Sequence, residues 1–319
     1  MVLADHFDKA EILEAIAGAR KMTQANVNIP ATIPEVATFF DKDSNTFSYV
    51  VIDPSSQHCA IVDSVLDFDY ASGNTHTNGA DDIIAYVKKH QLTVEWLIET
   101  HVHADHISAA PYIQQQVGGK LGIGEHILTV QETFGKIFNE GTDFARDGSQ
   151  FDHLFEDGEN YQVGGINCTA LHTPGHTPAC MVHVIGDAAF VGDTLFMPDA
   201  GTARADFPGG DAGVLFDSIQ KILALPPQTR IFMCHDYQPN GRPLEFQTTV
   251  AQQRDDNIHV NAGTAREHFV QLRENRDATL SMPRLILPSL QVNMKAGHLP
   301  EPESNGVAYL KIPLNLFHE

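Results

Sequence analysis

The chain is 319 residues long, which fits one large α/β unit or two modest domains. Its 20 Lys and Arg residues against 41 Asp and Glu residues give a formal net charge of −21, so we expect no binding to nucleic acid or to an anionic membrane. The longest apolar runs fall well short of the ~18 residues that a membrane-spanning helix needs. Four widely spaced cysteines without a CxxC pair, and an N-terminus without signal-peptide features, favour a cytoplasmic protein.

The first predicted element is an amphipathic helix over residues 5–22, followed by a polar connector over 24–34. We therefore predict an N-terminal extension of residues 1–35. A catalytic domain over 36–319, ending in a helical segment, follows it. At its start the β-rich runs VATFF, FSYVVID and CAIVDSV alternate with turn residues, which predicts antiparallel strands.

The next part of the chain mixes helices with strands. Residues 79–90 are predicted to be a helix, because acidic residues occupy the first turn and basic residues the last. The strand VEWLIET follows, and Pro111 suits the first turn of a helix that runs to Val117. Residues 101–108 are therefore expected to form a loop between a strand end and a helix start.

The second half of the chain repeats this alternation. Its predicted elements are strands at 161–163, 166–173, 180–186 and 188–196, a helix at 214–224, a strand at 230–234, and helices at 244–256 and 264–275. Glycine-containing turns at 164–165 and 186–187 are expected to join the strands as hairpins. The order is consistent with two sheets packed face to face and covered by helices.

The segment with the clearest chemistry is the expected loop after the strand VEWLIET. It reads His101-Val102-His103-Ala104-Asp105-His106 and offers four potential metal ligands in six residues. Imidazole and carboxylate together suit zinc, iron or manganese. The alternative is a polar loop that caps the next helix, but one cap needs only one side chain. The segment therefore predicts a metal site.

Three further candidates lie at the ends of apolar strands. They are His176 in HTPGHT, Asp193 in VGDTLF and His235 in MCHDY. Loops at strand ends commonly carry functional residues in α/β proteins. Alone, each is a weak signal, but with the first cluster they complete a set of metal ligands.

These residues resemble the signature of the metallo-β-lactamase superfamily. The THxHxDH motif matches Thr100 to His106, and the later His, Asp and His follow in the family's order. The resemblance implies an α/β fold of the αββα type, in which two mixed sheets are flanked by helices and the metal lies at one edge of the sheets. It does not specify the reaction, because hydrolases, nucleases and oxidoreductases share this scaffold.

A second resemblance narrows the reaction. The segment DAGTARADFPGG, with Arg204, Asp206 and Phe207, is similar to the Gly-x-Arg-x-Asp-Phe block of persulfide dioxygenases. Two later segments are also similar to that family, in particular to its bacterial β-lactamase-like hydrolase branch; they are HDY at 235–237 and LPSLQVNMKAG at 287–297. The resemblance implies oxidation of glutathione persulfide by O₂ to sulfite and glutathione. Small-molecule substrates and a possible homodimer are the partners we expect.

The persulfide dioxygenase resemblance implies one Fe(II) per chain, bound by His101, His176 and Asp193. The other candidates would then support these ligands without binding the metal; they are His103, Asp105, His106 and His235. The alternative is a two-zinc thioesterase like glyoxalase II, which hydrolyses S-acylglutathione. In it His101, His103 and His176 would bind one ion, Asp105, His106 and His235 the other, and Asp193 both.

Besides the metal ligands, the resemblance implies four catalytic candidates. Asp105 and His235 would orient the metal ligands, and the guanidinium of Arg204 would contact the carboxylates of the substrate or their partners. Tyr237 would donate a hydrogen bond in the active-site pocket. The alternatives are a solvated surface cation for Arg204 and a core tyrosine for Tyr237. A nuclease is disfavoured by the negative charge, and a non-catalytic binding protein by the complete set of ligands.

Overall fold

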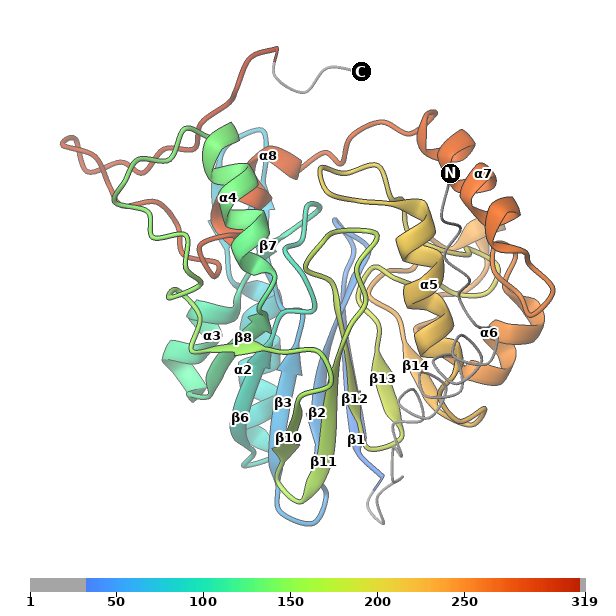
Figure 1. Cartoon of the computed structure of the whole chain (residues 1–319). Coiled ribbons are helices and arrows are strands. Elements are labelled where there is room, and N and C mark those ends of the chain that lie inside the picture. Colours follow the sequence, from blue (N-terminus) through green and yellow to red (C-terminus); the bar gives the residue numbers. More distant parts are fainter. Residues whose placement is uncertain (1–32, 316–319) are drawn as a thin grey trace, which may run out of the picture.

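The computed structural model describes residues 33–315 of the chain. Two six-stranded sheets pack face to face, with helices on both outer faces (Figure 1). This is the αββα architecture that the sequence predicts. The predicted helix over 5–22 lies outside the described residues. Within residues 33–315, none of the helices combines the length and apolar composition needed to cross a membrane.

The first sheet is mixed. Its strands, in spatial order, are β1 (Glu35–Asp41), β2 (Thr46–Ile52), β3 (His58–Val62), β6 (Thr93–Ile98), β8 (Lys120–Gly124) and β9 (His153–Phe155). The first three pair antiparallel, as predicted, and the last four pair parallel. A small sheet beside it contains β5 (Asn74–His76), β4 (Val65–Asp69) and β7 (Ile107–Ser108).

The second sheet contains the later strands. In spatial order they are β10 (Asn160–Val163), β11 (Ile166–His172), β12 (Met181–Ile185), β13 (Ala188–Phe190), β14 (Arg230–Phe232) and β15 (Gln247–Thr249). Only β13 and β14 pair parallel. The inner faces of the two sheets share a buried core to which Tyr49, Val51, Phe155 and Phe190 contribute.

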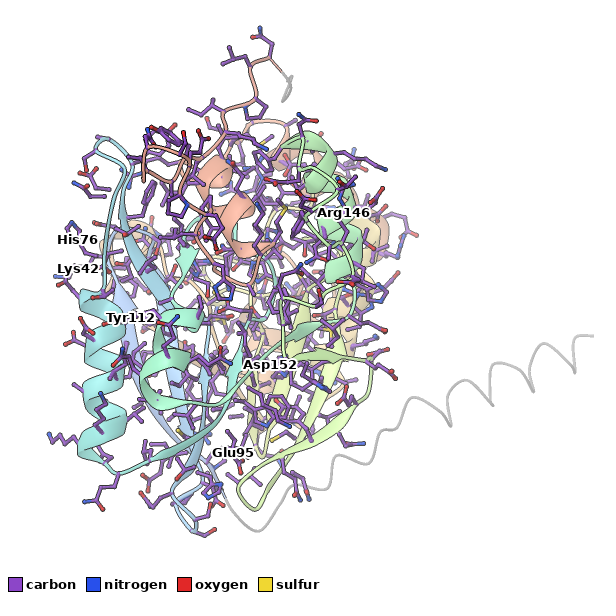
Figure 2. All side chains as sticks on the ribbon, turned by 90° about the vertical axis from the view of Figure 1, so that its left-hand side faces the viewer. Lys42, His76, Glu95, Tyr112, Arg146 and Asp152 are labelled. Atoms are coloured by element: carbon purple, nitrogen blue, oxygen red, sulfur yellow. The ribbon has the colours of Figure 1, made fainter. Side chains whose placement is uncertain are left out.

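The helices cover the outer faces of the sheets. They are α2 (Asn78–Lys89), α3 (Ala110–Val117), α4 (Ile127–Ile137), α5 (Ala212–Leu223), α6 (Val250–Asp256), α7 (Arg266–Asp277) and α8 (Ile286–Asn293), with a short 3₁₀ turn, η1 (Pro239–Gly241). Buried residues of α2, α3, α4 and α8 pack with the first sheet, and those of α5, α6 and α7 pack with the second. On the first side, Tyr112 of α3, which is labelled in Figure 2, donates a hydrogen bond of 2.8 Å to Asp81 of α2.

Two predicted elements end or begin at other positions. The predicted strand over 188–196 ends at Phe190, because Gly192 has a positive φ of 50° that breaks the extended backbone. The predicted helix over 244–256 is wrong in its first half. There β15 pairs with β14, and the helix begins only at Val250, where Thr249 and Gln252 form a capping box.

Replacing the capping residue tests this helix boundary. Thr249→Ala should lower the free energy of unfolding by about 1 kcal/mol, because the N–H of Gln252 loses its acceptor. Urea denaturation followed by circular dichroism measures the loss. Thr249→Ser, which keeps the hydroxyl, should stay close to the wild type. An unchanged midpoint for the alanine variant would mean that the cap contributes nothing to stability.

Candidate metal centre

The loop from 99 to 106 is held by one buried carboxylate. Asp63 follows β3 directly and accepts hydrogen bonds from the backbone N–H of Thr100 (2.8 Å) and from its hydroxyl (2.9 Å). It also accepts one from Nε2 of His103 at 3.0 Å. Burial alone would raise the pKa of Asp63, but His103 and Thr100 lower it, so the carboxylate stays charged. The loop therefore leaves β6 in one fixed conformation.

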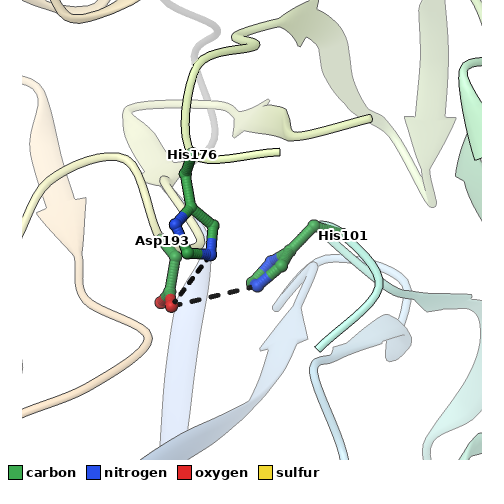
Figure 3. A group of neighbouring side chains, drawn as sticks. All are labelled: His101, His176 and Asp193. Carbon is green, nitrogen blue, oxygen red and sulfur yellow. Dashed lines mark ion pairs between the residues drawn. The ribbon is translucent and has the colours of Figure 1, made fainter. Parts of the chain in front are cut away.

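The second sheet supplies two further candidates from turns that follow its strands. Asp193 lies after β13, and His176 lies in the turn between β11 and β12. The residue before Asp193 must be Gly192, because a Cβ at this position would come within 2.6 Å of the Thr100 hydroxyl. The two sheets thus bring their loops into direct contact, and the three predicted iron ligands, His101, His176 and Asp193, meet there (Figure 3).

The distances in this triad suit one shared ion. The Oδ2 atom of Asp193 lies 3.9 Å from Nε2 of His101 and 3.6 Å from Nε2 of His176. Two atoms that each lie about 2.1 Å from one metal ion can be at most ~4.2 Å apart. Nε2 of His101 and Oδ1 of Asp193 are buried without a hydrogen-bond partner. These residues therefore fit a divalent metal of the first transition row.

Hydrogen bonds on the other ring nitrogen fix the tautomers of these histidines. Nδ1–H of His176 donates to the carbonyl of Arg204 at 2.8 Å, and Nδ1 of His101 lies 3.0 Å from the hydroxyl of Thr100. That hydroxyl already donates to Asp63, so His101 is the donor. In both rings Nε2 is left free to bind a metal. Burial and the neighbouring His103 also lower the pKa of His101, which favours the neutral imidazole.

The other four candidates lie beside this triad. Oδ2 of Asp105 lies 3.3 Å from Nδ1 of His106 and 3.4 Å from Nε2 of His235, which in turn lies 3.2 Å from Oδ1 of Asp193. Nδ1 of His103, Nε2 of His106 and Nε2 of His235 are buried without hydrogen-bond partners. The structure thus brings all seven sequence candidates together, and a second ion would also find free ligand atoms. Which of them bind metal stays a prediction.

In the metal-free protein, His235 balances the negative charge of this group. Burial would lower its pKa, but the carboxylates of Asp193 and Asp105 raise it to about 9. At neutral pH a proton therefore occupies His235. A metal ion bound through Nε2 would have to displace this proton.

A cavity of about 560 Å³ opens beside the metal candidates. Asp105, His176 and Asp193 contribute to its wall together with Phe196 and Tyr237. Tyr237 is 53% exposed, so the alternative of a core tyrosine is wrong. Its ring stacks on that of His235 with centroids 5.7 Å apart. A hydrogen bond from its hydroxyl to a substrate remains a prediction.

Arg204 also borders the cavity, but its guanidinium is already occupied. Two of its nitrogens donate to the carboxylate of Asp206 at 2.6 and 2.7 Å, and a third donates to the carbonyl of Ser281 at 2.7 Å. With 11% of the side chain exposed, the alternative of a solvated surface cation is wrong. The main chain of Arg204 holds His176 instead. Its fork is not free for a substrate carboxylate while these bonds persist.

Sequence reasoning missed several residues that position the site. Arg273 and Asp277 form a buried ion pair of 2.7 Å on α7, and Asp277 also accepts the backbone N–H of Ala205 at 2.8 Å. This pair fixes the loop whose carbonyl holds His176. The i,i+4 spacing was a signal for the pair, but not for its contact with the loop. Asp63, in the run CAIVDSV, carried no local signal of its role.

Comparison with known proteins identifies the family. Residues 41–235 match the model described as the metallo-beta-lactamase superfamily. The chain belongs to this superfamily. Membership of this superfamily agrees with the αββα fold and with the prediction that the protein is a metal-dependent enzyme.

Relatives that are about half identical to the chain carry the names of hydrolases or of a glyoxylase. The chain is 56% identical to a "probable metallo-hydrolase" of Burkholderia pseudomallei, over 88% of this chain and 99% of that protein. It is 53% identical to a "beta-lactamase hydrolase-like protein" of Agrobacterium fabrum, of which it covers 66%, and 47% identical to "glyoxylase B2" of Dictyostelium discoideum, of which it covers 97%.

More distant members carry the name of a dioxygenase. The chain is 27% identical to the mitochondrial persulfide dioxygenase ETHE1 of Bos taurus, over 88% of this chain and 95% of that protein. The solved structure of ETHE1 from Myxococcus xanthus matches with a TM-score of 0.66 and 27% identity, covering 83% of this chain and 100% of that one.

The role of Asp63 can be tested by metal binding. Asp63→Asn should weaken metal affinity about 10- to 100-fold, because an amide nitrogen in place of Oδ2 cannot accept the hydrogen bond of the Thr100 hydroxyl, which orients His101. Competition with a chelator measures the affinity. Asp53→Asn is a matched control, since Asp53 also follows a strand but accepts bonds from Ser55 and Gly165 away from the site. Equal affinities in the two variants would contradict the role of Asp63.

Proposed function

We propose that the protein is a glutathione persulfide dioxygenase with one Fe(II) per chain. The balanced reaction is GSSH + O₂ + H₂O → GSH + SO₃²⁻ + 2 H⁺. The observation that carries the proposal is the triad of two imidazoles and one carboxylate, two of whose members face the cavity. This ligand set is typical of non-haem Fe(II) oxygenases, which need open positions on the metal.

The similarity to persulfide dioxygenases supports the same reading. The solved ETHE1 structure is covered over its whole length by this chain, so the match includes every part of that enzyme. The HDY segment, which gives His235, Asp236 and Tyr237, lies beside the triad, as expected for a block that belongs to the active site. Bound Fe(II) would supply the redox chemistry that joins O₂ to the outer sulfur.

The residues of the chain would orient the reactants and limit access of water. Arg204 and Thr100 fix the rings of His176 and His101, so the triad needs little rearrangement. Phe196 and Phe207 form apolar parts of the cavity wall. His235, next to Asp193, can hold or release a proton at Nε2 as the charge in the site changes.

A two-zinc thioesterase that hydrolyses S-acylglutathione is the second candidate. It is favoured by the free ligand atoms on His103, His106 and His235, which exceed what one ion needs. The name of the Dictyostelium relative, which is 47% identical, points the same way. The two candidate functions share the fold and the glutathione part of the substrate, and they differ in metal content and in the need for O₂.

Oxygen consumption tests the proposal directly. Iron-loaded protein mixed with fresh glutathione persulfide should consume O₂ and form sulfite in a ratio of one to one. An oxygen electrode and a sulfite assay measure the two. His101→Ala should abolish both, because it removes one of three metal ligands. Rapid hydrolysis of S-lactoylglutathione without O₂ uptake would contradict the dioxygenase and support the thioesterase.

Asp105 gives a further test, because it is a metal ligand only in the two-zinc alternative. Asp105→Ala should lower kcat about 10- to 100-fold through lost orientation of His235, while the protein keeps most of its single iron. Elemental analysis beside the kinetics separates these effects. Loss of one of two zinc ions in this variant, together with loss of thioesterase activity, would contradict the mononuclear site.

A further inference from the structure

The wall of the cavity beside the metal candidates contains as many arginines as aspartates, although acidic residues are about twice as common as basic ones in the whole chain. Four arginines border it, namely Arg204, Arg273, Arg276 and Arg284. The whole chain has only 20 Lys and Arg residues and a net charge of −21. A negatively charged substrate is repelled by such a protein unless cations gather where it binds. The arginines that can bind it are those without an internal partner.

Two of the four are neutralised inside the protein. Arg204 forms a two-pronged ion pair with Asp206, and Arg273 forms one with Asp277. The remaining guanidinium nitrogens donate to the carbonyls of Ser281 and of Thr202. Both side chains therefore brace the cavity wall. Moving Arg273 would leave the buried carboxylate of Asp277 without its ion pair, and moving Arg204 would break its three hydrogen bonds, so either change costs stability.

The other two have free guanidinium groups. In residues 33–315, neither Arg276 nor Arg284 forms an ion pair or donates a side-chain hydrogen bond, and both are exposed. Arg276 lies in the last turn of α7. It borders the cavity together with His259, whose pKa is lowered to about 4 by burial first and then by the charges of Arg273 and Arg276.

Arg284 also borders the cavity. It lies in the segment that joins α7 to α8, which crosses the top of the molecule from the helices of the second sheet to those of the first (Figure 1). It also borders a neighbouring groove that contains Asp67 and Asp69. Arg284 therefore lies between the cavity and the groove that contains Asp67 and Asp69.

We propose that Arg276 and Arg284 bind the carboxylates of the glutathione moiety and so determine substrate specificity. This inference rests on the proposed function, and it changes the expected role of Arg204 from binding the substrate to holding the wall and His176. Glutathione carries two carboxylates and one ammonium group. Two separate guanidinium groups match the two separate carboxylates of this molecule better than one fork that is already occupied.

Binding of S-methylglutathione to the metal-loaded full chain tests the inference. The methyl group removes the thiol, so the measurement does not depend on turnover. Arg276→Gln and Arg284→Gln should each raise Kd about three- to tenfold. Arg254→Gln on α6 is the matched control, because it removes one positive charge outside the cavity and should leave Kd within about twofold.

The diethyl ester of S-methylglutathione shows whether carboxylates are the groups recognised. The wild type should prefer the free acid by about 10- to 100-fold, and the double variant should lose this preference. Equal effects of Arg276→Gln and Arg254→Gln, or an ester preference unchanged in the double variant, would overturn the inference. Arginine-dependent binding without O₂ uptake from persulfide would overturn the dioxygenase and still support the carboxylate site.

Discussion

The site depends on the buried carboxylate of Asp63. It joins the end of β3 to the loop after β6 through bonds from Thr100 and His103. The thiol of Cys234, which follows β14 of the other sheet, also points at it from 3.8 Å. Two sheets that share only an apolar core could slide relative to each other. A charged acceptor that needs donors from both sides of the site fixes where their loops meet.

A second level of support comes from the helices outside the second sheet. The buried pair of Arg273 and Asp277 holds the backbone at Ala205, and the adjacent carbonyl of Arg204 fixes His176. Charged groups are costly to bury unless they are paired. Here ion pairs already occupy the guanidinium groups of Arg204 and Arg273, so we assign the recognition of an anionic substrate to the exposed arginines at the rim of the cavity.

The fold and the metal candidates could be predicted because their signals are local or follow the strand order. The segment from His101 to His106 is contiguous, and His176, Asp193 and His235 each follow an apolar strand. The role of Asp63 could not be predicted, since it depends on a parallel pairing of β3 with β6. Arg204 was assigned to the substrate because its partners Asp206 and Ser281 are visible only in three dimensions.

Anomalous diffraction from crystals of protein purified without added metal tests the central claim most directly. The claim is that the loops of the two sheets converge on a single iron ion. We expect one anomalous peak at the iron edge, within bonding distance of His101, His176 and Asp193, and no peak next to His106. Two peaks at the zinc edge, with one of them bound by Asp105, His106 and His235, would contradict it.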